Sequence, residues 1–409
     1  MNNYIRGFLS ILPMTVAAFA HAQQTTAPGL TDTSIKIGVS APMSGATAAL
    51  GAIASGIELK VKAVNAAGGV KMADGKTRKI ELVILDDAFE PQRTLTNVRK
   101  MVEGSGVFAV VGTAGTQQSQ VLKPYLSQHS VPNLFVYSAV YEWGDETANP
   151  WTIGLVPSFS TEAAIYAQYL KGAKPSAKVG LLYVNTDMGL NFQAGFKSAI
   201  AGSNISVVAT QPTTPTDPTV DTQLNTLKAS GADTLLIVTQ PKQGAQAIRF
   251  AKESGWNPIT IVSYAASSMP ALKAAGFENA KGIHTAQFLK PITSYPTDAG
   301  VLRYLGDYQK YEPRFDKGDN LGQVGYTTGE ALVQVLQSMK QPTRRALMDA
   351  ARNMSAVDLS LLLPGISLTT KAGNDSFPIE SLSLFQFNGQ DYGSGSRVIS
   401  FEGKTPKQR

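Results

Sequence analysis

Short apolar segments alternate along the chain with segments whose apolar residues recur at helical spacing. Residues 35–41 are rich in β-branched side chains, and residues 50–65 carry apolar residues three and four positions apart before Gly68 and Gly69. The pattern continues with further elements, expected as strands at 80–85, 107–111 and 131–136 and as helices at 91–103 and 116–128. Strands this apolar are typical of a parallel sheet covered by helices on both faces.

The alternation starts again after an expected switch at 156–161. We predict strands at 179–184, 205–210, 234–238 and 259–263, and helices at 189–200, 219–229 and 243–253. Later segments predict helices at 301–311, 324–339 and 344–353, and a strand-like tail at 379–387. Since 409 residues exceed one ordinary hydrophobic core, the sequence predicts an α/β protein with two Rossmann-like lobes.

The N-terminus has the features of a secretory signal peptide over residues 1–22. Arg6 supplies a positive charge, residues 7–20 are mostly apolar, and Ala20-His21-Ala22 presents small residues for cleavage before Gln23. A membrane anchor fits less well, because the apolar stretch is shorter than about 20 residues and contains a proline. The sequence has no cysteine for a lipid anchor, a disulfide or a thiolate metal site, so we expect export to the periplasm.

Composition and motifs argue against several other functions. The formal charge of +6 is scattered, which does not predict a nucleic-acid surface. Residues 69–77 end like a phosphate-binding loop but follow a helix, so a hairpin turn is expected there. Asp86 and Asp87 point apart, which favours turn and capping roles, while His129 and His284 are isolated. We therefore expect neither an enzyme nor a bound cofactor or metal.

Small and hydroxyl-bearing residues follow the expected strands at their carboxyl ends. Ser44-Gly45 follows the first strand, residues 112–116 follow the third, and residues 137–140 follow the fourth. Ligands of open parallel sheets bind at these ends, near helix N-termini. A helix that starts near Thr116 favours an anion there, although the threonine also fits a simple N-cap role.

The order of these motifs resembles the branched-chain amino-acid-binding family of type I periplasmic binding proteins. The likeness covers about residues 34–400 and rests on IKIGVSAPMSG with ALG, NAAGGV, LVILDDAFEPQRT, VVGTAGT, VPNLFV with EWGD, and DTLLIVTQPKQGAQAIRFAKESG. The resemblance implies two lobes joined by three crossings and closing by hinge rotation. It implies lobe 1 at 34–156 plus 288–377, and lobe 2 at 157–287 plus 378–409.

The resemblance also implies ligand-binding positions. From lobe 1 these are Leu50, Thr116, Ser138, Ala139 and Val140, with Ser44 at the end of the first strand; from lobe 2 they are Asp187, Met188, Gln240 and Tyr264. Amino-acid receptors of the family place a glutamate where Tyr264 stands and often an aromatic residue where Gln240 stands. An enclosed ammonium without a carboxylate partner is costly.

We therefore predict a carboxylate or amide ligand that lacks an α-ammonium. Its flat or apolar body is expected on Tyr264 and Met188, with Tyr141 or Phe159 as further partners. Asp187 offers the alternative, as a partner for an ammonium.

The resemblance implies a periplasmic receptor that delivers a small-molecule solute to an ABC permease, and we expect a monomer. The alternative is a sensor of the same fold that serves a signalling partner. A transcription regulator would need a DNA-binding helix-turn-helix, and a hydrolase would need a nucleophile–base pair. The sequence shows neither feature.

Overall fold

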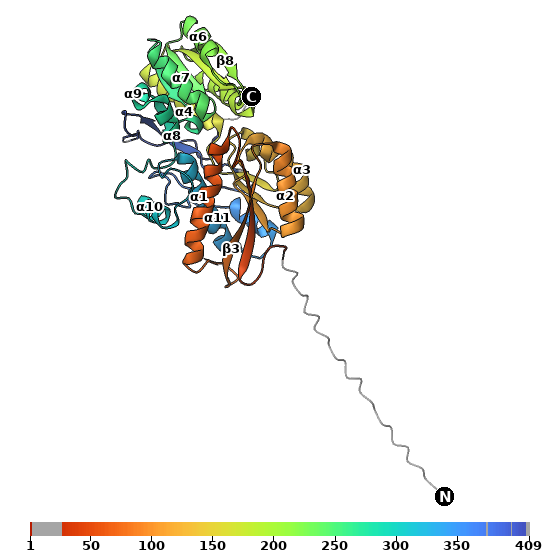
Figure 1. Ribbon diagram of the computed structural model, residues 1–409. Helices are drawn as coiled ribbons and strands as arrows, with labels where there is room; N and C mark the ends of the chain where they lie inside the picture. Colours follow the sequence, from red (N-terminus) through yellow and green to blue (C-terminus); the bar gives the residue numbers. More distant parts are fainter. Residues whose placement is uncertain (2–26, 374, 394, 406–409) are drawn as a thin grey trace.

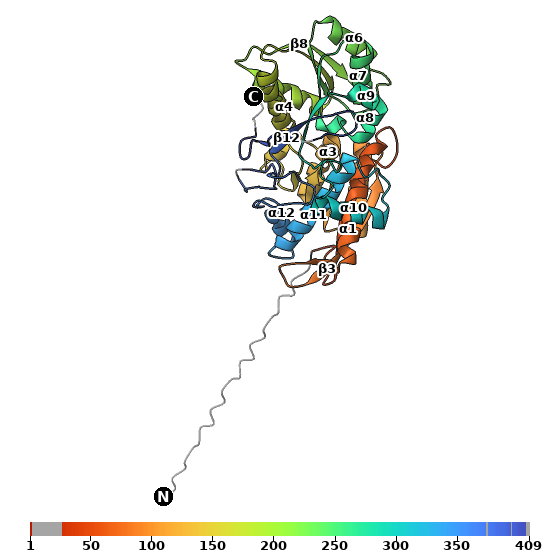
Figure 2. The ribbon, with the colours of Figure 1, turned by 90° about the vertical axis from the view of Figure 1, so that its left-hand side faces the viewer.

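The computed structural model describes residues 1, 27–373, 375–393 and 395–405. The chain forms two sheets in separate parts of the molecule, one above the other in Figure 1 and in the rotated view of Figure 2. Both sheets are mainly parallel and flanked by helices, which confirms the predicted two-lobed α/β fold. We call the lower part lobe 1 and the upper part lobe 2. Apart from Met1, the predicted signal peptide and its cleavage site lie outside the described residues.

Lobe 1 contains a six-stranded sheet in the order β2-β3-β1-β4-β5-β6. β1 pairs in parallel with β3 and β4, whereas β2 pairs antiparallel with β3 and forms the expected hairpin. The strands are β1 (Ser34–Ala41), β2 (Val70–Lys71), β3 (Thr77–Asp86), β4 (Ala109–Val111), β5 (Asn133–Val136) and β6 (Thr152–Gly154).

Lobe 2 contains a seven-stranded sheet in the order β13-β12-β11-β10-β9-β7-β8. The tail of the chain returns to this sheet, where β12 pairs antiparallel with β11 and with β13. The strands are β7 (Lys178–Val184), β8 (Ser206–Thr213), β9 (Thr234–Val238), β10 (Ile259–Val262), β11 (His284–Gln287), β12 (Ser381–Gln386) and β13 (Ile399–Ser400).

Helices from both ends of the sequence cover the sheet of lobe 1 (Figure 1). They are α1 (Ala52–Ala66), α2 (Pro91–Arg99) with the π-helix η2 (Lys100–Ser105), α3 (Thr116–His129), α10 (Ala299–Tyr311), α11 (Asn320–Ser338) and α12 (Arg344–Ala351), with the 3-10 turns η1 (Ala48–Gly51) and η3 (Tyr141–Gly144).

Glycines let α1 and α11 pack with their backbones almost in contact. A Cβ on Gly325 would lie 2.1 Å from the carbonyl oxygen of Ile53, and one on Gly56 would lie 2.1 Å from that of Gly322. No side chain fits at this distance. The pairing therefore fixes α11, which follows β7 to β11 of the second sheet in the sequence, onto lobe 1.

The helices of lobe 2 include three that we did not predict. The helices of this lobe are α4 (Phe159–Ala173), α5 (Asp187–Ile200), α6 (Asp221–Ala229), α7 (Pro241–Glu253), α8 (Met269–Ala275) and α9 (Phe277–Ala280), with the 3-10 turn η4 (Tyr264–Ala266). The unpredicted helices are α4, α8 and α9, and α4 begins inside the expected switch at 156–161. Among the described residues, no helix combines the length and the apolar character that a bilayer crossing requires.

The chain passes between the lobes three times: between β6 and α4, between β11 and α10, and between α12 and β12. These passages lie near the expected crossings. The lobe boundaries themselves, 34–156 plus 288–377 and 157–287 plus 378–409, stay a prediction.

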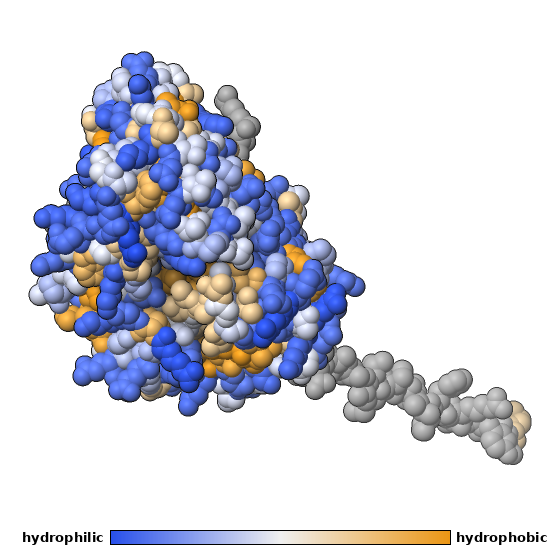
Figure 3. Space-filling view, turned by 45° about the horizontal axis from the view of Figure 1, so that its top comes forward, coloured by the Kyte–Doolittle hydropathy of each residue, from blue (hydrophilic) through white to orange (hydrophobic). Residues whose placement is uncertain are grey.

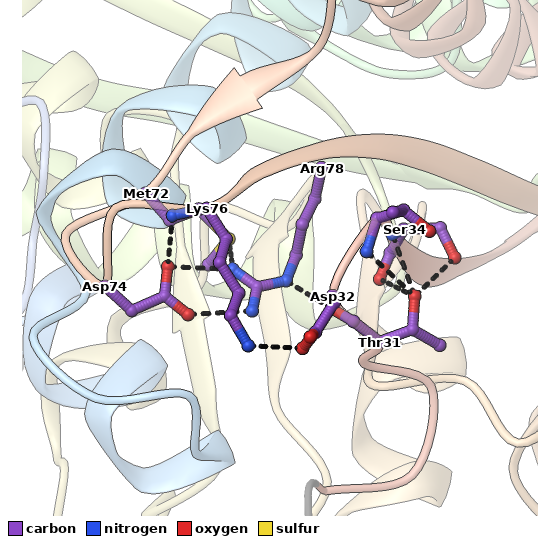
Figure 4. Close-up of polar contacts among 8 residues, drawn as sticks. Thr31, Asp32, Ser34, Met72, Asp74, Lys76 and Arg78 are labelled. Atoms are coloured by element: carbon purple, nitrogen blue, oxygen red, sulfur yellow. Dashed lines mark hydrogen bonds and ion pairs between the residues drawn. The ribbon is translucent and has the colours of Figure 1, made fainter.

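A buried arginine fastens the segment before β1 to the β2–β3 hairpin (Figure 4). The Arg78 side chain is 2% exposed and donates to both carboxylate oxygens of Asp74, at 3.0 and 2.7 Å. Its Nε donates to the carbonyl oxygen of Thr31, and Lys76 pairs with Asp32 nearby. The buried charge is therefore fully paired at the far end of lobe 1.

Candidate functional site

A cavity with about 800 Å³ of empty space opens between the two sheets, and we call it the cleft. Its lining comes from η1 and from segments at the carboxyl ends of β3 to β10, as expected for open parallel sheets. Figure 3 shows pale and orange, apolar residues around the hollow between the lobes. The lining residues are Leu50, Phe89, Gly115, Thr116, Gln117, Gln118, Tyr137, Ser138, Ala139, Val156, Phe159, Thr186, Asp187, Met188, Pro215, Gln240, Tyr264 and Ala265.

Eight of the ten expected site residues line this cleft. They are Leu50, Thr116, Ser138 and Ala139 of lobe 1 and Asp187, Met188, Gln240 and Tyr264 of lobe 2. Their role in holding a ligand stays a prediction.

Two expected residues, Ser44 and Val140, do not line the cleft. The Ser44 hydroxyl instead donates to the Asp86 carboxylate at 2.6 Å. That bond contributes most to the lowering of the pKa of Asp86 to about 2. Val140 is buried, 3% exposed, where it precedes η3. The turn role predicted for the Asp86-Asp87 pair is confirmed, because both carboxylates accept backbone N–H groups two residues ahead, whereas neither residue caps α2, whose N-cap is Glu90.

A short hydrogen-bonded chain places a free hydroxyl proton in the cleft. The buried Trp143 donates its indole N–H to Ser138 Oγ at 2.9 Å, and Ser138 Oγ lies 2.9 Å from Thr116 Oγ1. One hydroxyl proton of the Thr116–Ser138 pair is used between the two oxygens. The other proton is left to donate to a solute.

Three helices begin at the cleft without a side-chain cap. Gly115, Thr186 and Gln240 stand directly before α3, α5 and α7, and all three line the cavity. No side chain accepts a hydrogen bond from the first turn of any of these helices. Their free N–H groups and the positive ends of the helix dipoles favour a negatively charged or carbonyl-bearing group.

The N-cap role considered for Thr116 is wrong. The residue before α3 is Gly115, at φ +105°, and Thr116 is the first residue of the helix. A side chain on residue 115 would be strained at that φ and would collide with Gln118. The threonine hydroxyl is consequently available to the cleft.

Aromatic rings form much of the remaining wall. Phe89, Tyr137, Phe159 and Tyr264 line the cavity, and Phe159 stacks on Tyr264 with 6.4 Å between ring centroids. Phe159 is thus placed as expected, whereas Tyr141 packs on Phe377 outside the lining. Tyr137 belongs to the segment 137–140 that was expected at the carboxyl end of a strand, whereas Phe89 was not expected in the site.

The hydroxyl groups of Tyr264 and Tyr137 differ in their hydrogen bonding. Tyr264 donates its hydroxyl to the carbonyl oxygen of Pro157 at 3.1 Å. The Tyr137 hydroxyl has no partner among the described residues. Burial, with a smaller effect from the charge of Glu162, raises the pKa of Tyr137, so this hydroxyl stays protonated at neutral pH. Tyr137 therefore adds a second free donor to the cleft.

A buried glutamate lies behind the wall and does not face the cavity. Glu162 of α4 is fully buried and accepts hydrogen bonds from the Tyr264 N–H at 2.7 Å, Ser263 Oγ at 3.0 Å and Tyr166 OH at 2.8 Å. Burial raises the pKa of Glu162 to about 7 despite these donors. Asp187 is therefore the one charged residue in the cleft lining that the structure describes.

The lobes also touch at several points around the cleft. The Tyr141 N–H donates to Asn191 Oδ1 at 3.1 Å, and Asn320 Nδ2 donates to the carbonyl oxygen of Tyr264 at 3.3 Å. Tyr141 and Asn320 belong to lobe 1, and their partners belong to lobe 2. The geometry of the cleft is consequently tied to the orientation of the lobes.

One group of carboxylates, Asp375, Glu380 and Glu402, has oxygens within 4.8 Å of one another. Both oxygens of Glu380 accept backbone N–H groups, from Gly403 and Thr405. None of the three acids lines the cleft.

Comparison with known proteins places this geometry in a family. The chain is 23% identical to Leu/Ile/Val-binding protein homolog 8 of Brucella abortus (strain 2308) over 318 residues, covering 74% of this chain and 76% of that protein. Its fold matches the fatty acid ABC transporter substrate-binding protein of Thermomonospora curvata, with a TM-score of 0.78, 21% identity, and 94% and 96% of the two chains covered.

The fold also matches the solute-binding protein of an ABC transporter from Rhodopseudomonas palustris BisB5 in complex with 3,4-dihydroxybenzoic acid. The TM-score is 0.75 at 19% identity, with 92% of this chain and 99% of that chain covered. The model of the periplasmic binding protein family matches residues 34–392, which include both sheets up to β12. The chain therefore belongs to the periplasmic binding protein family.

Proposed function

We propose that this protein is the periplasmic solute receptor of an ABC importer, and that its cleft binds a small carboxylate or amide without an α-ammonium. The observation that carries this proposal is the set of three uncapped helix N-termini around a cavity lined by no cationic side chain. Helix ends and hydroxyl protons suit an anionic or carbonyl group. They offer nothing to an ammonium.

The aromatic wall supports a flat or apolar body for the solute. Phe89, Phe159, Tyr264 and Met188 provide apolar surface from both lobes. Relatives with this fold include proteins whose titles give a fatty acid and 3,4-dihydroxybenzoic acid, which are both carboxylates. We infer that Thr116, Ser138 and the start of α3 receive the carboxylate, while Tyr264 and Met188 cover the body.

Capture follows from the position of the cleft between the lobes. A solute that contacts both walls stabilises the arrangement in which the lobes are close, by the difference between its contacts in the open and closed states. An ABC permease can then distinguish loaded from empty receptor by the orientation of the lobes. The relatives named as ABC transporter proteins support this partner.

Matched pairs of ligands test the proposal by calorimetric titration. Leucine is compared with 4-methylpentanoate, and phenylalanine with 3-phenylpropanoate, since each pair differs only in the α-ammonium. We expect the acids to bind at least about tenfold more tightly, because an enclosed ammonium without a partner costs several kcal/mol. Tighter binding of both amino acids would overturn the proposed ligand class.

A further inference from the structure

A second cavity lies between the lobes on the other side of the turn η4, and we call it the hinge cavity. It has about 730 Å³ of empty space, close to that of the cleft. Tyr264 and Ala265 of η4 line the cleft, whereas Ser267 and Ser268, which follow η4, line the hinge cavity. A single short turn therefore separates the two spaces.

Both lobes contribute to the wall of the hinge cavity. Its apolar part consists of Met269, Leu289, Pro291 and Ile292, beside the ring of Tyr392. The Tyr392 hydroxyl donates to the carbonyl oxygen of Ser267, so this ring presents its apolar surface with its polar end already paired. The wall can thus bury the hydrocarbon part of a small molecule.

Three amides of this wall use their NH₂ groups within the protein. Gln287 Nε2 donates to Ser267 Oγ at 3.1 Å, Asn320 Nδ2 to the Tyr264 carbonyl at 3.3 Å, and Gln323 Nε2 to the Lys317 carbonyl at 3.3 Å. No described residue donates to the carbonyl oxygen of any of the three amides. Asn320 Oδ1 is buried as well as unpartnered. A buried acceptor without a donor is costly, so the Asn320 oxygen favours a molecule that brings an N–H group, and the oxygens of Gln287 and Gln323 are further acceptors beside it.

The carboxylates near the cavity also favour a ligand that brings N–H groups and a positive charge. Asp316 lines the cavity, and the buried Asp319 lies three residues further on, directly before α11. Neither carboxylate forms an ion pair with a residue that the structure describes, and each accepts a backbone N–H. Lys317 also lines the cavity, and both it and Asp316 are exposed, so these two charges largely offset each other and the buried Asp319 provides the net negative charge nearby.

We propose that the hinge cavity is a second binding site, for a small organic ammonium compound with an apolar body. The ammonium donates to the amide oxygens of Asn320 and Gln323 and is attracted by the buried Asp319 nearby. The body packs on Met269, Leu289 and Ile292. This chemistry is opposite to that of the cleft, where donors are free and cations are absent.

Occupation of the hinge cavity would be coupled to the cleft. The cavity is formed by residues of both lobes, so its shape depends on lobe orientation, and it shares η4 with the cleft. A ligand in either space then changes the affinity of the other space by the same factor, since such coupling is reciprocal. The hinge cavity would therefore adjust solute capture.

The test uses cyclohexylamine, which is protonated at neutral pH, with the mature protein. Binding is measured by titration calorimetry for the natural sequence and for three variants. Gln323→Leu removes one acceptor at similar volume, Ile292→Trp fills the cavity, and Thr116→Val changes only the cleft. Circular dichroism checks that each variant is folded.

We expect saturable binding of cyclohexylamine that both hinge-cavity variants weaken by about tenfold or more and that Thr116→Val leaves unchanged. Cyclohexanecarboxylate should show the reverse dependence on these variants if the cleft binds acids, so failure of the cleft proposal is detected separately. No binding of the amine, or loss of its binding in Thr116→Val alone, would overturn the hinge-cavity site. If one hinge-cavity variant does not fold, the other decides.

Discussion

The carboxylate of Glu162 accepts a 2.7 Å hydrogen bond from the backbone N–H of Tyr264, so a buried acid directly supports the aromatic wall of the cleft. The same carboxylate holds Ser263 and Tyr166, and the Tyr166 hydroxyl accepts the N–H of Ala286 in β11. The wall of the cleft is thereby linked to the strand that precedes the second crossing between the lobes.

This arrangement predicts that Glu162 makes stability depend on pH near neutrality. The pKa of Glu162 is raised to about 7 in the folded protein, above its ordinary value of 4.5, so the folded state binds its proton more tightly than the unfolded state. The contribution of Glu162 to the free energy of unfolding is therefore fully present below pH 4.5. It is lost as the pH rises through 7, which lowers the free energy of unfolding by up to about 3 kcal/mol.

Urea unfolding of the natural protein and of Glu162→Gln between pH 5 and 8 measures this contribution. The glutamine cannot titrate, so the difference in unfolding free energy between the two proteins should change across the range. Asp319, with a pKa raised to about 6 by burial, adds a slope of the same sign to both proteins and cancels in the difference. A difference that stays constant with pH would contradict the assignment to Glu162.

Thr116→Val should weaken binding of an acid such as 4-methylpentanoate by about 1–3 kcal/mol. The substitution keeps the volume but removes one hydroxyl of the Thr116–Ser138 pair, which leaves a buried ligand oxygen without its donor. Thr222→Val, near the start of the exposed helix α6, is the matched control and should leave the affinity unchanged. Equal affinity of the two variants would show that the Thr116 hydroxyl does not receive the ligand.

Asp187→Asn distinguishes an acid from an amino acid as the ligand. Asp187 is the charged residue of the described lining, and it repels a bound carboxylate. We expect its neutralisation to strengthen binding of 4-methylpentanoate by about two- to fivefold at low ionic strength. Calorimetry in 20 mM and 200 mM salt checks this, and the gain should shrink at the higher concentration. Weaker binding of the acid would contradict the repulsion by Asp187, and lost binding of leucine would instead favour the ammonium-partner role.

Gly325→Ala should destabilise lobe 1 strongly. The added Cβ would lie 2.1 Å from the Ile53 carbonyl oxygen, so α1 and α11 would have to separate, at a cost of about 1–3 kcal/mol or more. Gly306→Ala in α10 is the control, because its Cβ meets nothing within 4 Å and alanine favours the helix by about 1 kcal/mol. Thermal unfolding should therefore shift in opposite directions for the two variants.

Arg78→Met should lower the free energy of unfolding by about 1–3 kcal/mol, because it removes the hydrogen bonds of a buried guanidinium to the Thr31 carbonyl oxygen and to the more exposed Asp74 carboxylate. Lys76→Met breaks the neighbouring pair with Asp32, which is largely exposed, and should cost less than about 1 kcal/mol. Denaturant titration compares the two variants. If both variants lost a similar amount of unfolding free energy, the buried contacts of Arg78 would contribute no more to stability than the exposed pair of Lys76 and Asp32 (Figure 4).

Most buried strands could be predicted because they are apolar runs bounded by turn residues, and β9 occupies the expected 234–238. The short strands β6 and β11 were not predicted, because TIG and HTAQ are not apolar runs. The helix α4 could not be predicted either, since Phe159 to Ala167 are buried on all sides and leave no polar face to produce a helical pattern. Ser44 was misplaced because β1 and β3 run in register and bring Asp86 within reach of its hydroxyl.

Other parts of the site depend on backbone geometry that residue types do not reveal. Gly115 precedes α3 at φ +105°, so the helix begins one residue earlier than a threonine cap implies. Phe89 reaches the cleft from a loop at φ +64°, held by Gln118 Nε2, which donates to its carbonyl oxygen at 2.7 Å. Both conformations are set by contacts between segments far apart in the chain.

The close pairing of α1 with α11 has a consequence for how the molecule assembles during synthesis. Ile53 cannot meet Gly325 until more than three quarters of the chain has left the ribosome, whereas β7 to β10 of lobe 2 are contiguous. Contacts at such separation slow folding, because a long loop must close first. The strands of lobe 1 therefore emerge first, but this lobe completes its core only when the late helices arrive.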